Sequence, residues 1–336
     1  MAENSRRIGV VGAGAWGTAL AQAVAAQGHE TLIWAREAEV VTAVNDRHEN
    51  TLFLPGIALD AGVKATGDIA AIGSMDALLL VCPAQNLRAV AASLAPHARD
   101  GLPVVICAKG IEEKTGQLMT EVLAEAMPAA RAAVLSGPTF AHEIAAGKPT
   151  AVTLAATEPG LADKLAEAIG APRFRPYTSP DVIGVQIGGA VKNVMAIACG
   201  MVAGMDLGQN ARAALMTRGL QEMTRLSIAK GGAIETMMGL AGLGDLVLTC
   251  TSESSRNYTL GLEIGRGKRA SEILAARRTV AEGAYTAGAV TRLAARLGVE
   301  MPIVSGVDSI VNEDADLTRI MNELLARPFR REGIAG

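Results

Sequence analysis

The sequence predicts an α/β N-terminal domain with a doubly wound sheet, followed by an all-helical C-terminal domain. In the first half, short β-branched runs alternate with Ala-rich stretches, which is typical of a parallel sheet with helices on both faces. Near Ser179-Pro180 the alternation stops, and only helical patterns follow. The 336 residues also exceed the usual size of a single core. We therefore assign residues 1–180 to a Rossmann-type domain and residues 181–336 to a helical domain.

The predicted strands are short runs rich in Val, Ile and Leu. We place them at residues 7–11, 30–34, 77–81, 104–108, 132–135, 151–154 and 173–177. Ala-rich stretches predict helices at residues 16–27, 85–94 and 116–126, and the first of them stops at Gly28. In the second domain, helices are predicted at residues 182–205, 209–230, 235–240, 256–265, 270–276, 284–297, 302–312 and 316–326.

Composition narrows the class of protein. Lys and Arg total 31 and Asp and Glu total 34, a net charge of −3 that predicts no broad basic surface for nucleic acid or an anionic membrane. The four cysteines are widely spaced and include no Cys-x-x-Cys pair, so we expect neither a metal site nor disulfides. The N-terminal segment is polar, and the apolar run after it is too brief for a signal peptide. We expect a cytoplasmic protein.

One apolar stretch, residues 182–205, has the length of a membrane span. However, Gln186, Lys192 and Asn193 lie within it, and a Lys at mid-membrane costs roughly 3 kcal/mol. Several glycines lower its hydrophobicity further. We therefore expect a buried helix of a soluble domain and no membrane span.

A glycine-rich loop follows the first predicted strand and opens the first helix. Its sequence is Gly12-Ala-Gly14-Ala-Trp-Gly17. Gly12 permits the tight turn, Gly14 lets the backbone approach a pyrophosphate, and Gly17 lets helix and strand pack closely. The N-terminus of the helix offers free N–H groups to phosphate oxygens. This context predicts a dinucleotide-binding loop.

The end of the second strand bears on the choice of cofactor. A site that selects NAD places an acid there to hold the ribose diol. Here Arg36 takes that position, and a guanidinium suits the 2′-phosphate of NADP. NADPH is therefore favoured. The neighbouring Glu37 leaves NAD open, and Arg36 as an ordinary surface charge is a further alternative.

Two lysines are candidate catalytic or binding groups. Lys192 lies in a helix that is apolar on nearly every face, so its ammonium must be paired, reach outward, or have a lowered pKa. A lysine closer to neutrality is suited to passing a proton to a carbonyl oxygen. A packed stem with an exposed tip is the structural alternative. Lys109 follows a predicted strand beside Gly110 and can reach an anionic oxygen, although alone it reads as a surface lysine.

A second glycine cluster, residues 239–244, precedes a single carboxylate, Asp245. Asp245 can accept a hydrogen bond from a substrate hydroxyl or orient a lysine ammonium. Ten residues later, Ser255, Arg256 and Asn257 combine a guanidinium group with neutral hydrogen-bond donors, a combination that is suited to binding phosphate. The same run is also an ordinary helix N-cap.

The ordered set of short motifs is more specific than any one of them. It comprises Gly12-Ala-Gly-Ala-Trp-Gly-Thr-Ala-Leu-Ala21, Ala108-Lys-Gly-Ile-Glu112, Ser136-Gly-Pro-Thr-Phe-Ala141, Gly189-Ala-Val-Lys-Asn-Val194, Gly239-Leu-Ala-Gly-Leu-Gly-Asp-Leu246, Ser255-Arg-Asn257 and the Val280–Gly283 segment. On these motifs the chain resembles bacterial NAD(P)-dependent glycerol-3-phosphate dehydrogenases along almost its whole length. Ala15 departs from a frequent Ser and removes one possible contact to the pyrophosphate, whereas Thr139 replaces a frequent Ser and keeps the hydroxyl.

The resemblance implies reversible reduction of dihydroxyacetone phosphate to sn-glycerol 3-phosphate with NADP or NAD as cofactor, feeding phospholipid synthesis. It implies that Lys192 gives or takes the proton. The substrate contacts that it implies come from Lys109, Gly137, Thr139, Lys192, Asp245, Ser255, Arg256 and Asn257. The implied cofactor contacts come from Gly12, Gly14, Ala15, Trp16, Gly17, Arg36, Lys109, Ala141, Arg256, Val280 and Glu282.

Two other functions fit parts of the sequence. A ketopantoate reductase or hydroxyacid dehydrogenase has a similar layout, but a carboxylate substrate does not require Ser255-Arg256-Asn257 after the Asp245 loop. A non-catalytic NADP-binding regulator has no reason to keep both Lys192 and Asp245. The sequence leaves a homodimer open.

Overall fold

The structure is a computed structural model that describes residues 5–276, 281–329, 331 and 333. The chain forms two compact units, of which unit 1 comprises residues 1–108 and 119–182. Unit 2 comprises residues 109–118 and 183–336. Segment 109–118 belongs to unit 2 because Arg292 and Arg296 donate hydrogen bonds to its backbone carbonyls, at 2.8 Å to Glu113 and 3.0 Å to Thr115. The predicted single boundary at residue 180 assigns this segment to the first domain instead.

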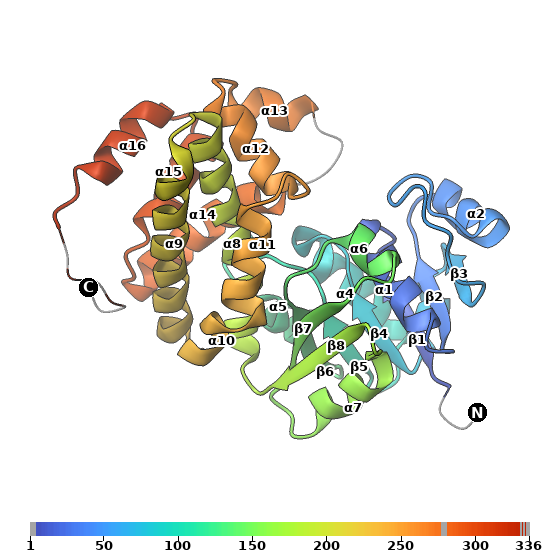
Figure 1. The fold of residues 1–336 in the computed structure, drawn as a ribbon. Coiled ribbons are helices and arrows are strands. Elements are labelled where there is room, and N and C mark those ends of the chain that lie inside the picture. The colour runs from blue at the N-terminus through green and yellow to red at the C-terminus, as the bar shows by residue number, and fades with distance from the viewer. Residues whose placement is uncertain (1–4, 277–280, 330, 332, 334–336) are drawn as a thin grey trace. The chain divides into compact units, whose positions relative to one another are not determined.

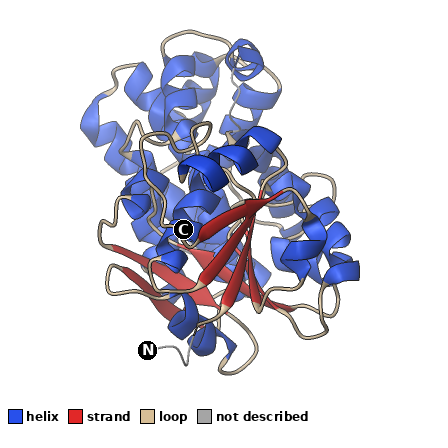
Figure 2. Cartoon of the chain, turned by 90° about the vertical axis from the view of Figure 1, so that its right-hand side faces the viewer, coloured by secondary structure: helices blue, strands red, loops and turns tan. Residues whose placement is uncertain are grey.

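Unit 1 is built on an eight-stranded sheet with the order β3-β2-β1-β4-β5-β6-β7-β8 (Figure 1). Figure 2 shows the strands in red with helices packed around them. The strands are β1 Arg7–Val11, β2 Glu30–Trp34, β3 Val63–Thr66, β4 Ala77–Leu80, β5 Pro103–Ile106, β6 Arg131–Ser136, β7 Thr150–Ala155 and β8 Phe174–Ser179. The predicted doubly wound Rossmann-type sheet is confirmed, and its chain reversal lies where β1 pairs with both β2 and β4.

The sheet differs from the prediction in two places. Strands β6 and β7 are antiparallel, whereas every other neighbouring pair is parallel. The connection between them holds only the five-residue helix α6 (Ala141–Ala145), which is too short to return the chain along the whole sheet. Strand β3 is missing from the prediction because its four residues, Val-Lys-Ala-Thr, contain a single strongly β-forming apolar residue.

The other helices of unit 1 connect these strands. They are α1 Ala15–Ala25, α2 Ala38–Arg47, α3 Ile69–Gly73, the 3₁₀ turns η1 Ala84–Asn86 and η2 Ala95–His97, α4 Leu87–Leu94, α5 Met119–Ala126 and α7 Leu161–Ile169. Helix α5 begins three residues later than predicted because Gly116 has a φ of 70° and forms a turn. On one face of the sheet, Leu79 packs into the same apolar cluster as Leu20 and Val24 of α1.

Unit 2 consists of helices, as predicted. They are α8 Val182–Gly204, α9 Gly208–Lys230, α10 Ile234–Met238, the π-helix η3 Leu240–Gly244, α11 Asp245–Cys250, α12 Arg256–Gly265, α13 Ala270–Ala276, α14 Glu282–Leu297, α15 Pro302–Asn312 and α16 Leu317–Leu325. The predicted helix at 235–240 is therefore shorter, and η3 and α11 are unpredicted.

Helix α8 is the centre of unit 2. It is long and apolar enough to cross a membrane, but 89% of its most apolar window is buried within the protein. Its glycines let other backbones approach closely. A Cβ on Gly200 would lie 2.1 Å from the carbonyl oxygen of Tyr258, and one on Gly261 would lie 1.9 Å from that of Ile197. Glycine on both helices therefore permits the close packing of α8 against α12.

Candidate active site

The glycine loop of unit 1 has the geometry that a dinucleotide loop requires. Gly12 has a φ of 116°, and a Cβ there would lie 2.9 Å from the backbone nitrogen of Cys82 at the end of β4. A Cβ on Gly17 would lie 1.8 Å from the carbonyl oxygen of Gly12. Gly14 is the extended N-cap of α1, and Ala15 is its first residue. No atom lies within 4 Å of a Cβ built on Gly14, so the backbone there is open to a ligand.

Two side chains fix this loop, one from the segment after α2 and one from α1. Asn50 is fully buried and donates through Nδ2 to the carbonyl of Ala13 at 2.7 Å and to Thr18 Oγ1 at 2.8 Å. The indole Nε1 of Trp16 donates to the carbonyl of Cys107 at 3.3 Å. The loop is therefore held in shape within unit 1 before any ligand binds, although Asn50 was not among the predicted residues.

Arg36 follows the end of β2, as predicted, and lies on the surface. Its side chain is 80% exposed and pairs with Glu37 through Nη2 at 2.9 Å. Glu37 is the residue before α2. The two groups expected to compete for the cofactor's ribose are thus paired with each other.

The segment after β6 supplies the other predicted residues of unit 1. Gly137 has a φ of 152°, and a Cβ there would lie 2.9 Å from the Cα of Val152 in β7. Thr139 Oγ1 donates to the carbonyl of Gly137 at 3.2 Å. Ala141 is the first residue of α6. This tight turn needs glycine at its first position.

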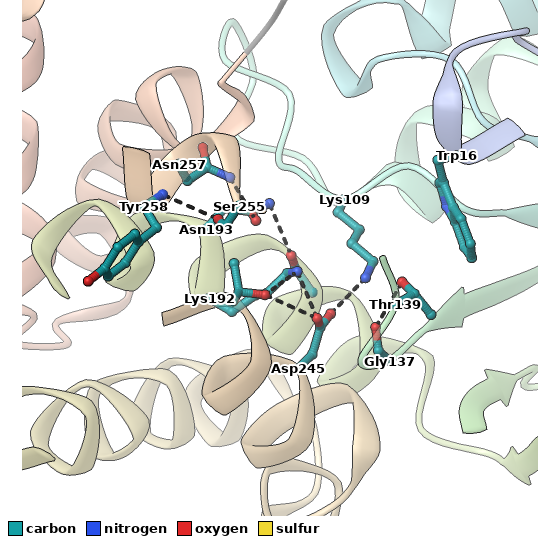
Figure 3. Close-up of polar contacts among 12 residues, drawn as sticks. Trp16, Lys109, Gly137, Thr139, Lys192, Asn193, Asp245, Ser255, Asn257 and Tyr258 are labelled. Carbon is teal, nitrogen blue, oxygen red and sulfur yellow. Dashed lines mark hydrogen bonds and ion pairs between the residues drawn. The ribbon is translucent and has the colours of Figure 1, made fainter. Parts of the chain in front are cut away.

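The candidate catalytic cluster lies in unit 2, where two lysines converge on one carboxylate (Figure 3). Lys192 Nζ lies 2.7 Å from Asp245 Oδ1, and Lys109 Nζ lies 2.7 Å from Asp245 Oδ2. Lys192 Nζ also donates to Thr249 Oγ1 at 2.8 Å. The Asp245 side chain is fully buried, whereas 14% of Lys109 is exposed. The cluster thus joins two lysines to one buried carboxylate.

Lys192 is buried, and its pKa is lowered. Its side chain is only 7% exposed, so the alternative of a packed stem with an exposed tip is wrong. Burial, opposed by Asp245 and aided by the charge of Lys109, lowers the pKa of Lys192 to about 8. Both protonation states are therefore accessible near neutral pH.

Close backbone packing brings Asp245 to Lys192. A Cβ on Gly188 of α8 would lie 2.3 Å from the carbonyl oxygen of Ala241, and one on Gly242 would lie 2.2 Å from that of Met237. The first contact packs the π-helix η3 against α8 and the second packs it against α10, and α11 begins at Asp245 directly after η3. π-helical turns are rare and frequently occur at functional sites.

A second polar chain joins α8, α12 and α14. Asn257 Nδ2 donates to Asn193 Oδ1 at 3.0 Å, and the backbone N–H of Gly283 donates to Asn257 Oδ1 at 3.0 Å. Ser255 is the N-cap of α12 and accepts from the N–H of Tyr258 at 3.2 Å, so the N-cap interpretation is confirmed. A hydroxyl that accepts one hydrogen bond can still donate another. Arg256 is exposed at the first position of α12.

Of the two remaining predicted residues, Glu282 is the first residue of α14, and Val280 lies outside the described residues. Sequence reasoning missed Asn193 and Thr249 as site residues. Thr249 follows Asp245 by four positions on one helix, a spacing that places both side chains on the same face. Within the described ranges, no group of three or more His, Cys, Asp or Glu side chains is arranged to hold a metal ion.

Comparison with known proteins gives the same result for both halves of the chain. Residues 7–162 match the family described as the N-terminus of NAD-dependent glycerol-3-phosphate dehydrogenase, and residues 181–322 match that enzyme's C-terminus. A protein of Parvibaculum lavamentivorans named glycerol-3-phosphate dehydrogenase [NAD(P)+] is 57% identical over 97% of this chain and 98% of its own.

Solved structures agree. The crystal structure of glycerol-3-phosphate dehydrogenase from Coxiella burnetii has a TM-score of 0.92 and 40% identity, covering 96% of this chain and 99% of its own. A ketopantoate reductase from Ralstonia eutropha shares the fold alone, with a TM-score of 0.61 and 16% identity over 95% of this chain and 99% of its own. By sequence over nearly its full length, the chain belongs to the family of NAD-dependent glycerol-3-phosphate dehydrogenases.

Proposed function

We propose that this protein is an NAD(P)-dependent sn-glycerol-3-phosphate dehydrogenase that reversibly reduces dihydroxyacetone phosphate at C2. The observation that carries the proposal is the buried Lys192–Asp245–Lys109 cluster in a chain whose relative is named for this activity. The bound nicotinamide supplies or accepts the hydride. The residues of this chain bind and orient the two reactants and handle the proton.

Lys192 is the proposed proton donor in reduction and the acceptor in oxidation. When hydride reaches C2, negative charge develops on the carbonyl oxygen, and an ammonium at that oxygen gives it a proton. The Lys192 ammonium has three N–H bonds. Two of them are directed at Asp245 and Thr249, which leaves the third for the substrate oxygen.

The other substrate contacts follow from charge and donors. Lys109 and Lys192 both lie at Asp245, and lysine ammonium groups are suited to an anionic substrate. The phosphate is proposed to bind at the N-terminus of α12, where backbone N–H groups, the Ser255 hydroxyl, Asn257 and the exposed Arg256 can donate. Gly137 and Thr139 are the proposed contacts from unit 1.

The cofactor contacts are proposals of the same kind. The open backbone at Gly14, beside Gly12 and Gly17, suits a pyrophosphate, and the fixed indole of Trp16 adjoins it. The remaining proposed contacts are Ala15, Arg36, Lys109, Ala141, Arg256, Val280 and Glu282. NADPH is favoured if Arg36 turns from Glu37 to the 2′-phosphate, and both cofactors are expected to support turnover.

The wider setting follows from the family. The product is proposed to feed phospholipid synthesis, and the protein is proposed to act in the cytoplasm. A homodimer stays a prediction. No observation favours a carboxylate substrate, because the likeness to a ketopantoate reductase extends to the fold alone.

A spectrophotometric assay of NADPH oxidation tests the proposal. Dihydroxyacetone phosphate should support turnover, whereas ketopantoate and unphosphorylated dihydroxyacetone should give little or none. Turnover of NADH with dihydroxyacetone phosphate should also be measurable. Binding of NADPH without oxidation of it in the presence of dihydroxyacetone phosphate would instead favour a non-catalytic NADP-binding protein.

A further inference from the structure

The amino ends of the strands in unit 1 carry an unusual concentration of basic side chains. Arg6 and Arg7 lie at the start of β1, Arg99 lies before β5, and Arg131 is the first residue of β6. Together with Lys164 of α7, Arg6, Arg99 and Arg131 line one cavity. These four cations stand against two acids, Asp76 in the lining and Glu158 paired with Arg131, which leaves a local charge of +2 in a protein whose net charge is −3. An excess of this sign concentrates small anions from solution.

The two acids are already engaged and hold two of the arginines in place. Asp76 accepts from the backbone N–H of Arg7 at 3.0 Å and from its Nη2 at 3.1 Å. Glu158 receives a two-pronged interaction from Arg131, with Nε at 2.7 Å from Oε2. The arginines lower the pKa of both carboxyl groups, so both stay charged at neutral pH. The acids therefore order the rim of the cavity without cancelling its positive charge.

The other three cations remain available. Arg99 donates through Nη2 to the backbone carbonyl of Asp76 at 3.1 Å, which orients its guanidinium toward the cavity without neutralising it. Arg6 and Lys164 are exposed and line the same cavity. In the part of the chain that the structure describes, Arg6, Arg99 and Lys164 make no ion pair within 4.0 Å.

The size and lining of the cavity limit the kind of ligand that it can bind. Its volume is about 280 Å³, and Ala77, Pro103, Leu161 and Leu165 form its apolar walls. Ligand pockets for drug-sized molecules typically range from about 300 to 1,000 Å³. A whole dinucleotide is therefore too large, whereas a phosphate or diphosphate group with a small organic part fits.

We propose that this cavity is a second anion site, which binds a small phosphate-bearing metabolite through Arg6, Arg99, Arg131 and Lys164. It is separate from the cofactor loop because the two are at opposite ends of the same strand. Arg7 begins β1 and Gly12 follows its end, so the five residues of β1 separate them by about 16 Å. The inference does not depend on the proposed dehydrogenase activity, since every residue in it lies in unit 1 and none is a proposed catalytic group.

Binding of inorganic pyrophosphate to the full chain tests this site. Calorimetry is carried out with saturating NADP⁺, so that the glycine loop cannot take up the probe. We expect a saturable binding event that Arg256→Ala leaves unchanged and that the double variant Arg6→Gln/Lys164→Gln weakens at least about tenfold, because two charge-assisted contacts are lost. Lys268→Gln in unit 2 is the matched control and should bind as the unaltered protein does. Higher salt should weaken binding, since the rim is exposed.

The results also identify the source of the phosphate and separate this inference from the proposed function. Unaltered affinity in the double variant, or no saturable binding, refutes the site. Vesicles of phosphatidylcholine with phosphatidic acid serve as the second probe. Binding to vesicles but not to pyrophosphate would also refute a soluble metabolite as the ligand. The double variant and Lys268→Gln should both retain turnover of dihydroxyacetone phosphate, so a loss of pyrophosphate binding alone concerns only this cavity.

Discussion

Replacing Lys192 by Met tests the proposed proton transfer most directly. Met keeps most of the apolar stem that fills the core of unit 2 and removes the ammonium. The buried Asp245 does not become an unpaired charge, because Lys109 still lies 2.7 Å from its Oδ2 and Thr249 still donates to Oδ1 at 3.3 Å. Removing one partner from a buried pair costs about 3–5 kcal/mol when a charge is left uncompensated. We therefore expect a smaller loss of stability and a folded variant.

The rate should fall much more than the stability. Loss of a general acid typically costs about 10²–10⁴-fold, and the loss of an ammonium beside the developing alkoxide adds to it. We expect a fall in kcat of at least about 10²-fold for reduction of dihydroxyacetone phosphate. NADPH binding, followed by fluorescence, should change little. Lys268→Met, an exposed lysine in the same unit, is the matched control and should keep full activity.

The pH dependence adds a second readout. With a pKa of about 8, Lys192 is protonated below that pH and deprotonated above it. For reduction, kcat/KM should therefore fall above about pH 8, and for oxidation it should fall below about pH 8. Both limbs should disappear from the residual activity of Lys192→Met. A variant that keeps more than about a tenth of the rate, or keeps both limbs, would show that Lys192 is not the proton donor.

Three further substitutions test separate parts of the molecule. Arg36→Ala should lower kcat/KM for NADPH more than for NADH, by about 1.5–3 kcal/mol of transition-state binding, and an unchanged ratio of the two would exclude a 2′-phosphate contact. Arg256→Ala should cost at least about 10²-fold in kcat/KM for dihydroxyacetone phosphate at saturating NADPH, while barely affecting slow reduction of dihydroxyacetone; equal losses would mean that the phosphate binds elsewhere. Burial raises the pKa of Glu222 to about 7, although it accepts from the N–H groups of Ile303 and Val304. The folded state thus holds this proton at pH values where the unfolded state releases it, so stability present at low pH is lost as the pH rises through about 7. In Glu222→Gln, the free energy of unfolding measured in urea should fall by up to about 3 kcal/mol less over this pH range. An identical fall in the two proteins would refute the raised pKa of Glu222 as its cause.

The sequence predicted the order of elements well because each left a local signal. Apolar runs located seven of the strands, and the strand–glycine–helix context located the tight turn at Gly12 and the start of α1. Strand β3 left no such signal, since its pairing with β2 comes from the sheet and not from its own composition. The antiparallel direction of β7 could not be predicted either, because the direction of a strand depends on how its connection packs.

The candidate site was predictable as a set of residue types but not as an arrangement. Lys192 was noticeable as a charge in an apolar helix, and Asp245 as a single carboxylate after glycines. Their 2.7 Å contact depends on the π-helix η3, whose hydrogen-bond pattern has no sequence signature. The pairing of Arg36 with Glu37 was equally unpredictable, because sequence treated the two side chains as rivals for a ligand.

The arrangement of one carboxylate between two lysines supports the proposal that Lys192 acts in both directions of the reaction. An ion pair formed by Lys192 and Asp245 alone would stabilise the ammonium and make Lys192 a poor base. Burial alone would deprotonate it and make it a poor acid. Here one oxygen of Asp245 accepts from Lys192 and the other accepts from Lys109. The carboxylate therefore offsets the cost of burying the Lys192 ammonium without holding Lys192 permanently in its protonated form. Lys109 opposes protonation of Lys192 through its own charge, and it can also bind the substrate. An anionic substrate that draws Lys109 away from Asp245 would weaken that opposition, and the proton on Lys192 would be held more firmly once the substrate is bound. Substrate binding would then itself favour the acid form that reduction requires.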